Sequence, residues 1–255
     1  MNFVISLETE IKRREHIKNE FAKHNVQFNF FDALTPNLAQ PFAQQLNLAV
    51  SSEDLTHGEL ACFMSHVSLW KKMLEENLSY IAIFEDDIYL GEDVALYLND
   101  YSWINPEWDI IKIEAFAEKV FLDKSRKKLP VGERVISKLL GANLGTAGYI
   151  LSNKGAEKYL NYIKNHKLIP LDQMIFNQYI GSENAGVYQM NPALCIQEMR
   201  LYPEKQTNLT SKLFFERKQR MKKNKKKGWG KLKLEAFRVF EQIKIFLFAQ
   251  KIEFR

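Results

Sequence analysis

The stretch 80-YIAIFEDDIYL-90 begins as a buried strand and ends in three consecutive acids. Residues 80–84 form an unbroken apolar run, which is typical of a strand covered on both faces of a sheet. Glu85, Asp86 and Asp87 follow where such a strand ends. Adjacent carboxylates repel each other, so the stretch indicates that a positive partner lies beside this turn.

The composition is that of a globular protein with a substantial core. The chain has 255 residues, 46% of them hydrophobic and 13% aromatic, enough for one large domain with or without an appendage. Cys62 and Cys195 both lie in apolar segments. They make neither a disulfide framework nor a CxxC metal site, and they favour a reducing interior. With no signal-peptide pattern and no apolar run of roughly 20 residues, we expect a soluble or surface-bound intracellular protein.

Strand and helix patterns alternate along the chain, which predicts a mixed α/β domain. The pattern predicts a β-α-β unit of a parallel sheet, with a strand over residues 2–7, a charged helix over 10–25 and a strand over 26–34. Pro36 and Pro41 indicate a loop. An apolar stripe at helical spacing then predicts a helix over residues 55–77, opened by a capping box of Thr56 and Glu59.

The remaining predicted elements follow the acidic turn. Strands are expected within 108–116, 145–152 and 186–197, helices over 153–166 and 171–180, and a polar hairpin or flap over 125–140. In such sheets ligands bind beyond the carboxyl ends of the strands, and the acids of residues 85–87 occupy a position of that kind.

Adjacent carboxylates after a hydrophobic strand suit a hard divalent cation. Mn²⁺ and Mg²⁺ prefer oxygen ligands and usually take one or two carboxylates, completed by water and phosphate. The cation offsets the repulsion of the acids and can neutralise a departing diphosphate. The alternative is a solvated acidic loop that binds nothing.

The surroundings of the turn resemble those of a known family. The helix "GELACFMSHVSLWKKML" followed by the strand ending in "FEDD" is similar to glycosyltransferase family 25, the bacterial lipopolysaccharide and lipooligosaccharide hexosyltransferases. The likeness continues at "GTAGYILSNKGAEKYL" and "IPLDQMIF" and covers roughly residues 1–200. It rests residue by residue on these positions: Gly58, Glu59, Cys62, Ser65, His66, Glu85, Asp86 and Asp87.

The resemblance implies a fold and a set of site residues. The fold would be GT-A-like, a Rossmann-type nucleotide-sugar domain with a mostly parallel sheet, in which the acidic turn replaces an Asp-x-Asp motif. Asp86 and Asp87 would bind Mn²⁺ or Mg²⁺. The expected donor-binding residues are Ser6, Arg13, Arg14, Glu59, His66, Glu85, Asp86 and Gly148. In this chain "LTPN" stands where the family usually has Asp-Gly after the second strand.

Several of these residues also have structural interpretations. Arg13 and Arg14 suit bidentate phosphate binding, or simply a solvated helix face. Glu59 can serve as a cap alone, and His66 as a hydrogen-bonded core histidine. A set of Glu59, Cys62 and His66 could bind zinc, but with Glu59 serving as the cap a third protein ligand is not apparent, and neither is a tetrahedral geometry.

Inverting transfer requires a base for the acceptor hydroxyl. The resemblance favours Asp172 in that role, with Glu114 at the end of "DIIKIE" as the runner-up. An acid in the first turn of a helix, as at Asp172, is also explained by the helix dipole. Gly145 and Gly148 flank a strand start, where a missing side chain lets a ligand or another backbone approach.

The charge divides the chain into a predicted domain, residues 1–215, and a tail, residues 216–255. The tail holds 14 Lys or Arg and 4 Asp or Glu, and the rest of the chain holds 22 and 27. Apolar residues at mostly helical spacing follow the lysine run, so the tail is expected to be a basic amphipathic membrane-surface anchor. Nucleic-acid binding would not need that apolar face, and the remaining alternative is a helix packed on the body or on another subunit.

The resemblance, taken with these observations, implies a glycosyltransferase that moves galactose or glucose from a UDP-sugar to a lipid-linked oligosaccharide. We expect it in the cytoplasm, peripheral on the inner face of the bacterial inner membrane, with no nucleic-acid partner. Two rivals stay open. A nucleotidyltransferase could use the same acidic turn and would release pyrophosphate. A non-enzymatic membrane-surface module would show no metal-dependent nucleotide binding.

Overall fold

The first β-α-β unit has the predicted form. The computed structural model describes residues 1–183, 185–204 and 244–255. It begins with β1 (Asn2–Ser6), α1 (Ile11–Lys23) and β2 (Asn29–Asp32), and β2 pairs in parallel with β1. The second neighbour of β1 is β3 (Tyr80–Glu85), also parallel, so the acidic turn begins beside the end of β1.

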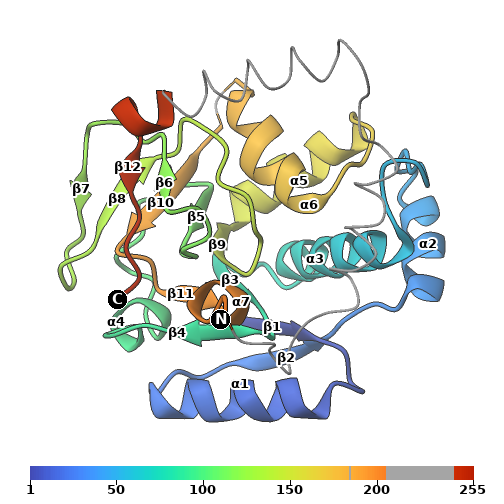
Figure 1. Cartoon of the computed structure of the whole chain (residues 1–255). Coiled ribbons are helices and arrows are strands. Elements are labelled where there is room, and N and C mark those ends of the chain that lie inside the picture. Colours follow the sequence, from blue (N-terminus) through green and yellow to red (C-terminus); the bar gives the residue numbers. More distant parts are fainter. Residues whose placement is uncertain (184, 205–243) are drawn as a thin grey trace.

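An eight-stranded sheet forms the centre of the molecule (Figure 1). Its other strands are β5 (Ile110–Lys112), β7 (Lys127–Lys128), β8 (Val135–Lys138), β9 (Gly148–Ser152) and β10 (Val187–Asn191). Their order is β2-β1-β3-β9-β5-β10-β8-β7. β9 and β8 run antiparallel to their neighbours, and the other strands share one direction. The expectation of a mixed α/β domain with a mostly parallel sheet is therefore confirmed.

Helices cover both faces of this sheet, because its strands alternate their side chains between two cores. Ile81 and Ile83 of β3 join one cluster, which includes residues of α2 (Pro36–Gln45), α3 (His57–Glu75) and α5 (Asn153–Lys164). Ala82 and Phe84 join the other, with residues of α1 and of α4 (Ala95–Leu98). The fully apolar run 80–84 thus belongs to a strand buried on both sides.

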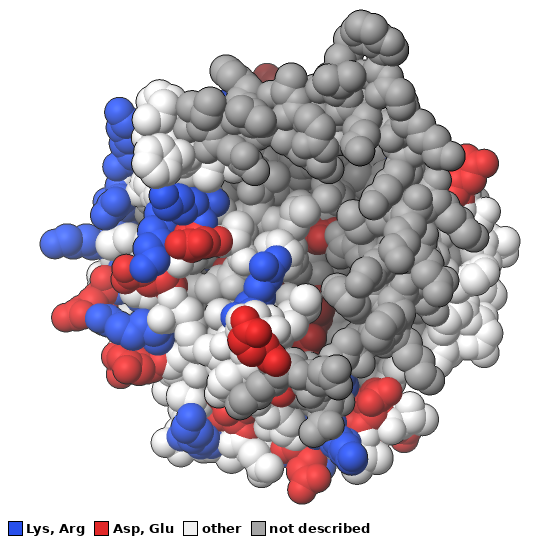
Figure 2. All heavy atoms as spheres, viewed as in Figure 1, with Lys and Arg blue, Asp and Glu red and all other residues white. Residues whose placement is uncertain are grey.

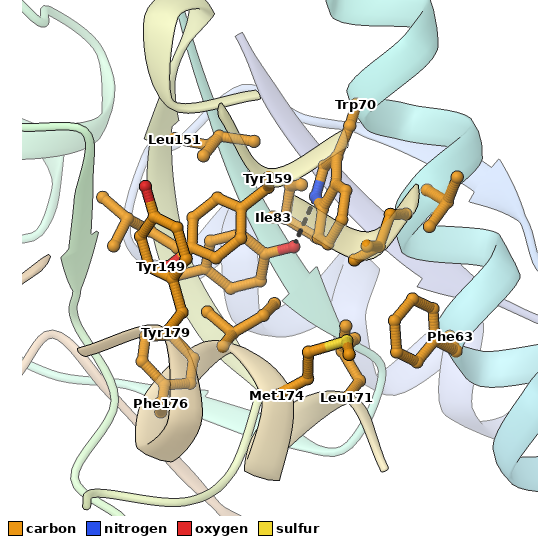
Figure 3. Close-up of a cluster of buried hydrophobic side chains, with 14 of the residues drawn as sticks. Phe63, Trp70, Ile83, Tyr149, Leu151, Tyr159, Leu171, Met174, Phe176 and Tyr179 are labelled. Atoms are coloured by element: carbon orange, nitrogen blue, oxygen red, sulfur yellow. Dashed lines mark hydrogen bonds between the residues drawn. The ribbon is translucent and has the colours of Figure 1, made fainter. Parts of the chain in front are cut away.

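The helix α3 starts as its sequence predicts. Thr56 and Glu59 form a complete capping box, in which each side chain bonds the other residue's backbone amide. The helix then packs on α2 and α5. Trp70 lies on its inner face, and its indole nitrogen donates a hydrogen bond to the hydroxyl of Tyr149 on β9 (Figure 3). This bond ties α3 to the sheet beneath it.

Two sequence expectations were wrong. Residues Pro36–Gln45 form α2 instead of a loop; Pro36 opens this helix, at a position where no amide donor is needed. The expected strand over 186–197 is divided at the cis peptide Asn191–Pro192. Its first part is β10, and its second part, β11 (Cys195–Gln197), pairs with β4 (Ile88–Leu90) in a separate small sheet.

Short elements complete the described fold. The predicted helix over 171–180 consists of three short helical segments: α6 (Leu171–Gln173), a π-helix (Met174–Gln178) and a 3₁₀ helix (Tyr179–Gly181). Met174 and Phe176 of this segment are buried in the core shown in Figure 3. α7 (Glu198–Leu201) follows β11. The expected polar hairpin over 125–140 is present as β7 and β8.

The last residues of the chain lie on the body. β12 (Gln250–Lys251) pairs with β6 (Lys119–Val120), and Ile252 is buried. Residues 205–243, which include most of the predicted basic tail, lie outside the described residues, so the tail remains a prediction. Residues 244–248 are helical and expose three apolar side chains, Phe246, Leu247 and Phe248. Figure 2 shows basic side chains at the left edge of this view, where Figure 1 places β7 and β8.

Candidate active site

The acidic turn lies between two strands of different sheets. β3 ends at Glu85 and β4 begins at Ile88, so Asp86 and Asp87 form the connection. Ser6, at the carboxyl end of β1, donates a hydrogen bond of 2.6 Å from its hydroxyl to Asp86 Oδ2. Two predicted site residues 80 positions apart therefore meet at the strand ends.

Arg13 of α1 is the cation of this turn. It forms an ion pair and a hydrogen bond with Asp86, and its Nη2 lies 3.8 Å from Asp87 Oδ2. Burial would lower the pKa of the Arg13 guanidinium, but the two carboxylates together raise it. The side chain of Asp86 is 7% exposed and that of Asp87 15%, so Asp87 is the more accessible carboxyl group.

Glu85 and Asp87 are carboxyl groups that their surroundings make harder to ionise. Thr146 donates a 2.7 Å hydrogen bond to Glu85 Oε1, and the Gln197 amide lies 3.4 Å from both carboxylates. Burial, then the charge of Asp87, raises the pKa of Glu85 to about 8. Burial also raises the pKa of Asp87 to about 6, although Arg13 opposes that shift. Among the described residues, the ion pairs of this turn involve a single cation, Arg13.

His66 is a buried, hydrogen-bonded histidine. One ring nitrogen, Nδ1, lies 2.8 Å from the hydroxyl of Tyr149, and the two rings are stacked. Burial lowers the pKa of His66 to about 3, so the imidazole is neutral at neutral pH. The other nitrogen, Nε2, is buried and has no hydrogen-bond partner among the described residues. Glu59 lies in the first turn of the same helix, where it completes the capping box with Thr56.

The contacts of Arg14 are made outside the acidic turn. Its guanidinium pairs with Asp32 at the end of β2, donates to the backbone oxygens of Ser6 and Leu7, and lies over the ring of Phe30. The structure therefore places Arg13 at the acidic turn and Arg14 at the neighbouring strand ends. Binding of phosphate by either residue remains a prediction.

The two candidate bases lie in different environments. Glu114 is fully buried; its Oε2 accepts hydrogen bonds from Lys112 at 2.8 Å and from the Ala147 amide at 3.1 Å. Asp172 is at the start of α6, where its Oδ1 accepts a bond from the Gln173 amide. Glu114 therefore has the contacts of a structural ion pair, and the role of either residue as a base remains a prediction.

Gly148 has a packing reason for its missing side chain. A Cβ atom at this position would lie 2.1 Å from the sulfur of Cys195. Gly145 has a φ of +87°, a left-handed conformation that favours glycine, and a Cβ there would lie 2.7 Å from Glu114 Oε1. Neither glycine requires a ligand to explain it, and donor binding at Gly148 remains a prediction.

Sequence reasoning missed Thr146, Gln197 and Lys112. Thr146 lies within the "GTAG" stretch that carried the resemblance, so its position was a usable signal. Gln197 reaches the turn because β11 pairs with β4. No local pattern marks that pairing.

Comparisons with known proteins identify the family. The model of glycosyltransferase family 25, described as LPS biosynthesis protein, matches residues 1–175. The chain belongs to this family. It is 35% identical to the lipooligosaccharide biosynthesis protein lex-1 of Haemophilus influenzae, over 95% of this chain and 89% of that one.

Other relatives have a similar level of identity. The lipooligosaccharide biosynthesis protein lic2B of Haemophilus influenzae is 38% identical, with 89% of this chain and 86% of that one covered. The lacto-N-neotetraose biosynthesis glycosyltransferase LgtB of Neisseria meningitidis is 38% identical, with 78% and 75% covered. Within the described residues, no helix has both the length and the apolar character needed to cross a bilayer.

Proposed function

We propose that this family 25 enzyme transfers a hexose, galactose or glucose, from a UDP-sugar to a lipooligosaccharide or lipopolysaccharide acceptor, with inversion. The names of its relatives support the acceptor class, since they are lipooligosaccharide and lacto-N-neotetraose biosynthesis proteins. The domain would be GT-A-like, with the donor bound beyond the carboxyl ends of β1 and β3.

The observation that carries the proposal is the unbalanced charge of the acidic turn. Arg13 pairs with two of the three carboxyl groups, Asp86 and Asp87. The pKa values of Glu85 and Asp87 are raised, first because both groups are buried and then because other acids lie beside them. A divalent cation fits this oxygen-rich set. Mn²⁺ or Mg²⁺ bound there would neutralise the diphosphate that leaves.

The residues then have distinct roles. Asp87 is the principal metal ligand, because it is more exposed than Asp86. Asp86, held by Ser6 and Arg13, orients Arg13 and faces the ribose or the metal. Glu85 orients the pair from the strand end. Asp172 removes the proton of the acceptor hydroxyl.

The acceptor class favours a position at the inner face of the bacterial inner membrane, where the part of the basic tail that precedes β12 would hold the enzyme to anionic lipid. The exposed side chains of Phe246, Leu247 and Phe248 support an apolar contact with that surface. The lysines of residues 222–227 would add the electrostatic part.

Calorimetry tests the donor and the metal together. We expect UDP to bind measurably only when Mn²⁺ or Mg²⁺ is present, and UDP-galactose or UDP-glucose to bind better than GDP-mannose. Asp87→Asn should abolish turnover and weaken binding of UDP with metal, while the exposed control Asp93→Asn should change neither. Normal activity of folded Asp87→Asn protein would remove the metal hypothesis. Release of pyrophosphate instead of UDP would indicate a nucleotidyltransferase.

A further inference from the structure

Three side chains, one of the acidic turn and two of the neighbouring helix α3, form a second candidate metal site. Cys62 and His66 are separated by four positions on α3, so they lie on one face of the helix. Glu85 approaches them from the end of β3. One ligand atom from each, the Cys62 sulfur, a His66 ring nitrogen and a Glu85 oxygen, lie within 4.8 Å of one another.

The ring of His66 is held in place by its neighbours. Its Nδ1 bonds the hydroxyl of Tyr149, which also accepts the indole N–H of Trp70. Stacking on Tyr149, at an interplanar angle of 15°, fixes the plane of the ring. A histidine that ligates a metal usually bonds an outer partner through its second nitrogen in this way. Nε2 is left buried and unpartnered among the described residues, a costly state for a core histidine.

Glu85 is oriented in the same manner. Thr146 donates to Oε1 at 2.7 Å, and the Gln197 amide lies 3.4 Å from Oε2. Cys62 and Glu85 are both half-buried, so solvent and small ions can reach them. Cys195, by contrast, is fully buried, and neither cysteine forms a disulfide.

We propose that Cys62, His66 and Glu85 bind Zn²⁺ in a site separate from the hard-cation site of Asp87. Sulfur, imidazole nitrogen and carboxylate oxygen together suit zinc, whereas Mn²⁺ and Mg²⁺ prefer oxygen ligands alone. Ligand atoms around a tetrahedral zinc are about 3.3–3.8 Å apart for bonds of 2.0–2.3 Å. The three atoms lie within 4.8 Å of one another, so metal binding requires a small shift of these side chains to reach that value. Three protein ligands leave the fourth position open to water.

Cobalt substitution tests the site in the full-length protein. Co²⁺ added to chelator-treated protein should give a thiolate-to-cobalt charge-transfer band and the visible bands of tetrahedral cobalt, at one equivalent, and Zn²⁺ should remove both. Cys62→Ser should abolish the charge-transfer band and weaken Zn²⁺ binding roughly 100-fold or more, beyond the usual loss of an outer partner. Cys195→Ser should keep the band.

Two further variants separate this site from the donor metal. Asp87→Asn should keep the cobalt bands, and Cys62→Ser should keep metal-dependent UDP binding, so failure of the proposed function and of the zinc site are distinguishable. Bound Zn²⁺ should also protect Cys62 from alkylation in the native protein. No charge-transfer band in the wild type, or a band that survives Cys62→Ser in protein with a native circular dichroism spectrum, would overturn the zinc site.

Discussion

Glu85 is a carboxyl group that folding makes harder to ionise. Its ordinary pKa of 4.5 rises to about 8, first because it is buried and second because Asp87 lies beside it. The folded state therefore binds a proton that the unfolded state has lost. By linkage, this group's contribution to stability is present at low pH and is lost as the pH rises from about 4.5 through about 8.

Glu85→Gln should remove that dependence. The amide keeps an acceptor for Thr146 and cannot ionise, so relative to the wild type the variant should gain stability between pH 5 and pH 8.5. Thermal unfolding at both pH values, without divalent metal, measures the difference. An equal difference in melting temperature at the two pH values would contradict the raised pKa.

Asp172 and Glu114 should respond differently to neutral substitutions. Asp172→Asn should keep UDP-sugar affinity and lower kcat by roughly 10²-fold or more, because a base acts mainly in the transition state. Glu114→Gln should lower thermal stability instead, because it leaves the buried Lys112 without its carboxylate. Steady-state kinetics and melting curves of both variants decide. If Glu114→Gln shows the pure kcat loss, the two roles must be exchanged.

Among the elements, the strand at the chain end is the least expected. The Ile252 amide donates to the Glu118 carbonyl, and the Ala193 amide donates to the Glu253 carbonyl, so backbone bonds also hold the residues that follow β12. Arg134, itself buried, donates to the carbonyl of Arg255. Residues 249–255 therefore belong to the folded body, although their composition places them in the basic tail.

Gly91→Ala should loosen this end strand. A Cβ on Gly91 would lie 2.1 Å from the carbonyl oxygen of Arg255, a backbone atom, so the segment that follows β12 would have to shift. We expect faster hydrogen exchange at β12 and a lower melting temperature. Gly181→Ala is the matched control, because a Cβ there meets nothing within 4 Å. Unchanged exchange at β12 in Gly91→Ala would show that the strand is not held there.

At the scale of the whole molecule, charge is divided between an acidic body and a basic segment near the chain end. Residues 1–215 carry 22 basic and 27 acidic residues, and residues 216–255 carry 14 and 4. Because residues 249–255 pack on the body, deleting everything after Lys218 would remove packed structure together with the lysines. A test of membrane attraction must leave residues 244–255 in place.

Neutralising the lysine run should weaken binding to anionic vesicles. The variant changes Lys222, Lys223, Lys225, Lys226 and Lys227 to Gln. Each cation near an anionic surface contributes about 1 kcal/mol, and salt should weaken wild-type binding because it screens these charges. The matched control changes five exposed body lysines, Lys12, Lys18, Lys23, Lys154 and Lys164. Equal co-sedimentation of the two variants would require the membrane proposal to be withdrawn.

Local patterns determined the elements on which the site stands. The apolar run 80–84 defined a strand buried on both faces, and the Thr56–Glu59 box defined the start of α3, because these signals act over a few neighbouring residues. The motifs from Gly58 to Asp87 were sufficient to indicate the family. The acids at the end of β3 were correctly expected at a strand end.

Tertiary structure alone decided what surrounds those acids. Thr146 and Gln197 contact Glu85 although they are 61 and 112 positions away in the sequence. Glu85 joins Cys62 and His66 as a candidate metal ligand only because β3 packs beside α3. The division of residues 186–197 between two sheets and the return of residues 249–255 to β6 have the same cause. Such contacts depend on which strands pair and which faces meet, and that is settled by the burial of the whole core, which no short stretch of sequence contains.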